Sequence, residues 1–173
     1  MAKNKIYTKK VIEHFSNPHN YGKIKNYDGI GKVGNVVCGD VMWLYIKIVK
    51  NEKGKEIIQD IKFETFGCVA ALATSSIITD LAKGKTLDDA LKIDKNEIVN
   101  SLGGLPPIKI HCSVLAADAL AEAIYDYLLR NKKKIFPELE KRHKRILKEI
   151  EVIDEKYKDW LDIEEKMHKH HHE

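Results

Sequence analysis

The chain has 173 residues, of which 43% are hydrophobic and 32% are charged, a composition typical of a soluble globular protein with a sizeable core. Its net charge of +4 is weak, and lysines alternate with acidic residues instead of clustering as they do in nucleic-acid-binding proteins. No apolar run approaches the ~20 residues of a membrane span, and the charged start has no signal-peptide core. We therefore expect a cytoplasmic protein that binds neither nucleic acid nor membrane.

The first part of the chain predicts a short amphipathic helix over residues 7–16, followed by a Gly- and Asn-rich loop to about residue 40. The loop contains "GIGKVG" at residues 29–34, a formal match to the dinucleotide-binding pattern GxGxxG. That pattern binds a nucleotide only when a strand precedes it and a helix follows it, whereas here it lies between a loop and a predicted strand. We interpret these glycines as loop flexibility and exclude a nucleotide site.

Two strands are predicted next, over residues 41–50 and 56–66, because both segments are rich in β-branched and aromatic residues. The "NEKGK" between them has the length and the glycine of a hairpin turn. In the second strand Ile57, Ile61 and Phe63 alternate with charged residues. This alternation predicts one covered face and one wetter face, as in an antiparallel sheet.

Helices are predicted in the second half of the chain. The segment after Cys68, "VAALATSSIITDLAKG", indicates a helix that ends at Gly84. Thr86 and Asp89 resemble a capping box that opens a further short helix. An apolar stripe with helical spacing then predicts a long helix over residues 112–129.

The composition becomes strongly charged after residue 130, and Pro137 suits the start of another helix. Apolar residues recur there every seven positions, as in the seam of a coiled coil. The seam consists of Leu139, Ile146, Ile153 and Trp160, with His143, Ile150 and Tyr157 between them. It fits either a helix packed on its own domain or a contact with a partner. We therefore expect a domain over residues 1–130 and a helical extension over residues 131–173.

The three cysteines, Cys38, Cys68 and Cys112, are the main functional signal. An odd count with no secretion signal argues against a disulfide framework, and the lack of a CxxC pair argues against zinc ribbons. Each cysteine lies at a boundary between elements, where a buried filler cysteine is not expected. Two of them open predicted helices, a position that favours the metal-binding thiolate. The pattern indicates a metal site.

Residue chemistry alone leaves the kind of metal site open. A [2Fe–2S] cluster needs four ligands, and Asp40 and His111 are the nearest candidates for the fourth position. A carboxylate is a poorer ligand than thiolate for such a cluster, so the cluster would be labile. The same residues could hold one Zn²⁺ tetrahedrally in a structural zinc module. An enzyme with a Cys112–His111 nucleophile pair is disfavoured, because adjacent side chains rarely face one substrate.

Several motifs between about residues 7 and 130 resemble the IscU/NifU-N-type iron–sulfur cluster assembly scaffolds. They are, in order, "NPHNYG", "CGDVMWLYIK", "FETFGC", "ATSSIITDLAKGKTLDDAL" and "LPPIKIHCSVLAADAL". The resemblance implies an α+β fold, with a small antiparallel three-stranded sheet packed with helices. It also implies a scaffold and not an enzyme. Such a scaffold receives sulfur from a cysteine desulfurase and binds iron (Fe²⁺). It builds a labile [2Fe–2S] cluster from them and transfers the cluster to recipient apo-proteins.

The resemblance also assigns individual positions. The implied cluster ligands are Cys38, Asp40, Cys68 and Cys112. Asp40 would keep the cluster labile, His111 would be a further metal ligand, and Cys112 would accept the persulfide sulfur. Zn²⁺ would occupy the site when no cluster is present. Leu105–Lys109 matches a segment that an Hsp70-type chaperone recognises in some members, and two open sites could share a cluster in a homodimer.

Two segments depart from the family pattern. Around the second cysteine the family usually has Gly-Cys-Gly-Ser-Ala, whereas Val69 and Ala70 here make the rim more apolar and remove a glycine's freedom. The usual Pro-Ala before the first cysteine is "VV". Both changes leave the implied ligands intact. The extension lies outside the resemblance, and its "HKHHHE" end is either a weak metal-binding segment or a tag.

Overall fold

The structure, a computed structural model, describes residues 6–35 and 39–170, with side chains to residue 155. Its elements are α1 (Lys9–Ser16), β1 (Gly29–Gly34), β2 (Val41–Lys50), β3 (Glu56–Phe66), α2 (Val69–Ala82), α3 (Leu87–Leu91), α4 (Lys95–Ser101), a 3-10 turn (Pro107–Lys109), α5 (His111–Arg130) and α6 (Pro137–His170). None of the described helices is long and apolar enough to cross a membrane.

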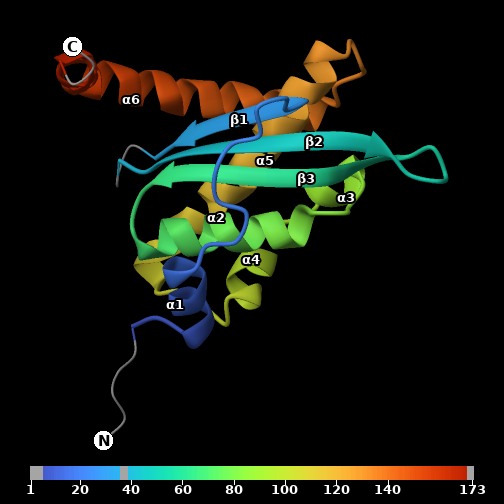
Figure 1. Ribbon diagram of the computed structural model, residues 1–173, viewed down its shortest axis with the longest axis horizontal. Coiled ribbons are helices and arrows are strands. Elements are labelled where there is room, and N and C mark those ends of the chain that lie inside the picture. Colours follow the sequence, from blue (N-terminus) through green and yellow to red (C-terminus); the bar gives the residue numbers. More distant parts are fainter. Residues whose placement is uncertain (1–5, 36–38, 171–173) are drawn as a thin grey trace, which may run out of the picture.

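A three-stranded antiparallel sheet in the order β1-β2-β3 forms the centre of the molecule. Helix α5 packs across β1 and β2, while α2 packs along β3. Figure 1 shows α6 beside the β1 edge, and α1 and α4 on the other side of the molecule, beyond α2. The structure confirms the predicted α+β fold, its sheet and the C-terminal helix.

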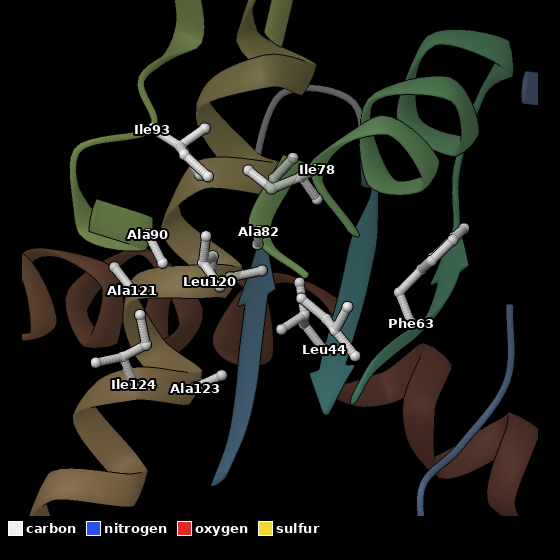
Figure 2. Packing of buried hydrophobic residues seen from close by; sticks show 14 of the residues in the cluster. Leu44, Phe63, Ile78, Ala82, Ala90, Ile93, Leu120, Ala121, Ala123 and Ile124 are labelled. Atoms are coloured by element: carbon white, nitrogen blue, oxygen red, sulfur yellow. The ribbon is translucent and has the colours of Figure 1, made fainter. Parts of the chain in front are cut away.

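The core lies between the sheet and these helices. Six residues of β2 and β3 are fully buried there: Met42, Leu44, Ile46, Ile58, Ile61 and Phe63. Figure 2 shows Leu44 between Leu120 of α5 and Phe63 of β3, with Ile78 of α2 nearby. Shortening one of these side chains, as in Leu44→Ala, removes roughly 2–5 kcal/mol of stability because a cavity remains. This core fixes how the sheet and helices meet, and thereby where their ends lie.

The prediction of a loop up to residue 40 is wrong in its second half, because "GIGKVG" forms β1, which pairs with β2. Its glycines serve packing and not flexibility. A Cβ on Gly29 would lie 2.2 Å from the carbonyl oxygen of Ala123, and one on Gly31 would lie 2.1 Å from that of Ala119. Glycine therefore lets the strand backbone lie directly on the backbone of α5. β1 leads to β2 and not to a helix, so the exclusion of a dinucleotide motif is consistent with this topology.

The alternation expected on the second strand is also wrong at one position. Ile57 is only partly buried, and Ile58 takes its place in the core. The register shifts opposite Lys47 and Ile48, which makes Gln59 an extra residue on β3. Such a bulge moves the inward-facing positions by one residue.

Helix α6 packs on its own domain. Leu139, Ile146 and Ile153 are 5%, 1% and 8% exposed, and α6 contacts α5 and β1. A Cβ on Gly34 would lie 2.6 Å from the Cδ1 of Ile153. At its first three positions the seam is therefore buried against the helix's own domain, the first of the two arrangements that we expected. The side chains of Tyr157 and Trp160 lie outside the described residues.

Candidate metal centre

Four of the expected site residues come together at one end of the sheet. Asp40 immediately precedes β2, Cys68 is the N-cap of α2, and His111 and Cys112 open α5. The strand register explains why Asp40 and Cys68 lie close together, since Val41 at the start of β2 pairs with the last residue of β3. Residues just before β2 and just after β3 must therefore lie at the same edge. The packing of α5 beside α2 then adds the remaining two residues.

The side chains of this group converge closely. The Sγ atoms of Cys68 and Cys112 are 4.0 Å apart, which is too far for a disulfide. The Oδ2 of Asp40 lies 4.0 Å and 3.9 Å from these two sulfurs. The Nε2 of His111 is 3.6 Å from the sulfur of Cys112. Ligand atoms around a tetrahedral Zn²⁺ are roughly 3.5–4 Å apart, so these spacings fit groups that bind one metal centre.

The centre is closed on one side and open on the other. Asp40 is 5% exposed and Cys112 is 1% exposed, whereas Cys68 and His111 are partly exposed. Burying a carboxylate is costly unless a cation or hydrogen bonds compensate for lost hydration. A buried acid beside two thiols is therefore suited to a positively charged ion that enters from the open side.

Cys38, the remaining expected ligand, lies outside the described residues. The chain on either side of it is held together by two backbone hydrogen bonds. The Asn35 amide donates to the Asp40 carbonyl and the Gly39 amide donates to the Asn35 carbonyl, each at 2.9 Å. Gly39 has φ +69°, the left-handed conformation that favours glycine. These bonds fix the backbone from which the Asp40 side chain reaches the thiols.

A positive charge lies beside the thiols. Negative charge on Cys68 raises the pKa of the Lys109 ammonium, and Tyr7 and Cys112 add smaller contributions in the same direction. Lys109 belongs to the segment that we expected to bind a chaperone, and its place beside the centre was not foreseen. Its position three residues before Cys112, about one helical turn, was an available signal.

Gly67 is a second residue whose importance the sequence analysis missed. A Cβ there would lie 2.6 Å from the Cβ of Ala71 and 3.0 Å from the carboxyl carbon of Asp40. Only glycine lets the chain turn from β3 into α2 directly under the buried acid. In the first segment that departs from the family pattern, Val69 is partly buried, whereas Ala70 is fully buried in a small cluster with Ala71 and Cys112. The second, the "VV" before Cys38, lies outside the described residues.

Helix α6 reaches the edge of the centre. A cleft of about 320 Å³ beside His111 is bounded by α5 and by Arg145 and Glu149 of α6. The C-terminal extension thus forms part of the surroundings of the candidate metal centre, a role that the sequence did not indicate.

Comparisons with known proteins find close relatives. A family model described as NifU-like N terminal domain matches residues 6–134, which leaves all of α6 outside the match. Two proteins of Archaeoglobus fulgidus, named iron-sulfur cluster assembly scaffold protein IscU 1 and IscU 2, are each 56% identical over 128 residues. The alignment covers 74% of this chain and 80% of each relative.

An Escherichia coli K12 protein with the name iron-sulfur cluster assembly scaffold protein IscU is 50% identical over 124 residues, 70% of this chain and 93% of that protein. A scaffold is not a catalyst, so these names agree with the expectation of a protein that is not an enzyme. Among solved structures, a nitrogen-fixing NifU-like protein (N-terminal) from Brucella abortus has a TM-score of 0.57 at 21% identity. The match covers 72% of this chain and 96% of the Brucella abortus chain. At this identity the likeness supports the fold alone.

Proposed function

This chain belongs to the family of NifU-like N-terminal domains, and from that premise we propose that it is a scaffold for iron–sulfur cluster assembly. The relatives that carry this name are 50% and 56% identical to it. The observation that carries the proposal is the convergence of Asp40, Cys68 and Cys112, with His111, in one partly open centre. We assign this role to residues 1–130 and regard residues 131–173 as an extension of the scaffold domain. A cytoplasmic location is part of the same prediction.

The cargo is a [2Fe–2S] cluster built from Fe²⁺ and sulfide, and the sulfide is formed when a thiol reductant supplies two electrons to each persulfide sulfur. The proposed ligands are Cys38, Asp40, Cys68 and Cys112. Two irons with two protein ligands each use these four positions. Asp40 is the weak member of the set because a hard oxygen suits iron–sulfur centres less well than thiolate. His111, 3.6 Å from the Cys112 sulfur, is placed to take over a vacated position when the cluster leaves.

Sulfur enters from a cysteine desulfurase, with Cys112 as the acceptor. The Cys112 thiolate attacks the outer sulfur of the desulfurase persulfide and forms a new S–S bond. The donor's S–S bond breaks, and its electron pair stays on the desulfurase thiolate. Lys109 places a positive charge beside the two thiols, close to the atoms of this step.

Zn²⁺ would fill the same centre in the absence of a cluster, and a structural zinc module is the second candidate function. The two differ in what the ion does. A zinc module unfolds when a chelator removes the ion. A scaffold with its own core of buried residues between the sheet and the helices stays folded.

The remaining partners are recipient apo-proteins and an Hsp70-type chaperone that binds Leu105–Lys109. Ile108 in this segment is 74% exposed and offers an apolar anchor. The open side of the centre also permits a homodimer that shares one cluster between two copies.

The proposal is tested by anaerobic reconstitution with Fe²⁺, cysteine and a cysteine desulfurase, followed by visible absorption and by transfer to an apo-ferredoxin. We expect a coloured cluster that leaves for the acceptor. In the same assay Cys112→Ser should lose both persulfide loading and cluster formation. Cys68→Ser, the matched control at the more exposed thiol, should lose the cluster but keep the persulfide. Mass spectrometry of the persulfide separates these outcomes. Loss of the persulfide in Cys68→Ser, with the persulfide retained in Cys112→Ser, would overturn the assignment of Cys112 as the acceptor.

A further inference from the structure

A second group of metal-ligating side chains lies between α1 and α2, away from the candidate metal centre. His14 is in the last turn of α1, His19 follows this helix, and Asp80 is on α2. Their ligand atoms lie within 4.8 Å of one another. Asp80 comes twelve residues after Cys68, which places it roughly 18 Å along the helix from that thiol. Figure 1 shows α1 against α2, on the side of the molecule opposite α6.

His14 is held as a metal-binding histidine usually is. It is 6% exposed, and its Nδ1 lies 2.7 Å from the Oγ of Ser76. Histidines that bind a metal commonly donate their other ring N–H to a fixed acceptor, which orients the ring. When Nδ1 donates to Ser76, Nε2 is the nitrogen available to an ion.

His19 is positioned by the same serine. Its backbone amide donates to the Oγ of Ser76 at 2.8 Å. The next residue, Asn20, has φ +55°, and its Nδ2 donates to the Oγ1 of Thr79 at 2.9 Å. These contacts hold the turn on α2, so the imidazole of His19 is placed before any ligand arrives.

Asp80 completes the group and keeps it open to solvent. Its Oδ2 is 2.6 Å from the Nδ1 of His19, and the two side chains are 36% and 39% exposed. An ion would replace this hydrogen bond by two metal–ligand bonds. Water can reach the remaining coordination positions from the exposed side.

We propose that His14, His19 and Asp80 form a binding site for one divalent first-row transition-metal ion, with water as the other ligands. Two imidazoles and one carboxylate with open positions are the donor set of non-haem Fe²⁺ sites, and imidazole also suits Zn²⁺ and Co²⁺. The site contains no thiolate, so its chemistry differs from that of the candidate metal centre. Its existence does not depend on the proposed function.

The same hydrogen bonds could instead hold α1 on α2 with no ion, and the experiment must separate these roles. Co²⁺ is a suitable probe because its visible absorption reports nitrogen and oxygen ligands, whereas thiolate ligands add strong charge-transfer bands. The test protein is the full chain with Ser at Cys38, Cys68 and Cys112. It also carries Gln at the tail histidines His168, His170, His171 and His172.

We expect this protein to bind one Co²⁺ and to show a higher melting temperature with the ion than without it. His19→Gln and Asp80→Asn should each weaken Co²⁺ binding by at least about tenfold, as expected when one ligand is lost. His143→Gln is the matched control. It also removes a histidine bonded to a carboxylate, Glu122, but one outside the three-residue group. It should leave Co²⁺ binding unchanged.

A second measurement uses the chain with all its cysteines, in case the serine background does not fold. After one equivalent of Zn²⁺ has filled the thiol centre, added Fe²⁺ or Co²⁺ should broaden the amide NMR signals of residues 14–20 and 76–80. Unaltered ion binding by His19→Gln, or broadening elsewhere in the chain alone, would show that these contacts are purely structural and would overturn the proposal.

Discussion

Two buried carboxylates, Asp40 and Asp118, have opposite surroundings. Asp118 on α5 is 3% exposed and accepts hydrogen bonds from Arg142 at 2.7 Å and from Arg145 at 2.9 Å and 3.0 Å. Asp40 is 5% exposed, and the side-chain contacts that the structure records for it are with the thiols of Cys68 and Cys112. The protein compensates the charge of Asp118 with its own arginines. The groups that it places beside Asp40 are two thiols, which can bind a metal, so we expect a bound ion to supply the compensating charge.

The comparison assigns different purposes to the two acids. The ion pairs of Asp118 attach α6 to α5, and that attachment is a contribution to the fold. Asp40 contributes to the fold chiefly through its backbone, which accepts the Asn35 amide at 2.9 Å. Its carboxylate is then available for binding. Substitutions around Asp118 should therefore change the free energy of unfolding, whereas substitution of Asp40 should change the binding of the cluster.

The largest expected effect comes from removing the arginines. The double variant Arg142→Met, Arg145→Met leaves Asp118 buried without its cations. A broken buried ion pair costs about 3–5 kcal/mol, so the free energy of unfolding from urea titrations should fall by that amount. The triple variant that also carries Asp118→Leu is the control, because replacing the whole group by apolar side chains should restore most of the loss. A double variant as stable as the wild type would mean that α6 is held by its apolar seam alone.

The second prediction concerns Asp40→Ala. The urea unfolding of the metal-free variant should change by less than about 1 kcal/mol, because its carboxylate has no cation partner among the described contacts to lose. After reconstitution the cluster should persist several-fold longer than in the wild type, because water or His111 replaces the charged oxygen and release slows. Decay of visible absorption in the presence of an apo-acceptor measures this. Faster release from the variant would refute the assignment of Asp40 as the residue that keeps the cluster labile.

The residues of the candidate metal centre could be selected from the sequence because the patterns that mark them are local. Cysteines at three boundaries, with an acid two residues after the first and a histidine before the last, mark a site whatever the tertiary packing. Four of these five residues converge in the structure, and Cys38 lies outside the described part of the chain. The supporting Gly67 was not found, because its reason is a close approach of Asp40 and Ala71 across the fold.

The errors in the predicted fold have the same cause. The glycine-rich strand β1 has low intrinsic β-propensity, and its glycines are required by the backbone of α5 and not by any local turn. The exchange of Ile57 for Ile58 follows from a bulge that depends on the pairing with β2. The ion pairs between α5 and α6 join residues 24 and 27 positions apart. The apolar spacing of α6 predicted the seam but could not identify α5 and β1 as the elements that cover it.

The smallest expected effect concerns a third buried acid at the same interface as Asp118. Glu122 is 7% exposed, and its carboxylate lies 2.9 Å from the Nδ1 of His143, whose ring stacks on Tyr125. Burial raises the pKa of Glu122, and the hydrogen bond and charge of His143 oppose this rise. Among the other charged neighbours, Asp118 adds to the rise and Arg142 of α6 reduces it.

The sign of the pH dependence follows from that shift. With a folded pKa above the ordinary value of 4.5, the contribution of Glu122 to stability is fully present below pH 4.5 and is lost as the pH rises through the folded pKa. Glu122→Gln keeps the shape and hydrogen bonding but does not titrate. Between about pH 5 and about pH 7 its unfolding free energy in urea should therefore fall less, or rise more, than that of the wild type. An equal pH dependence of the two proteins would show that His143 and Arg142 compensate the charge of Glu122 as fully as the two arginines compensate Asp118. Asp40 would then be set apart from both buried acids of the α5–α6 interface.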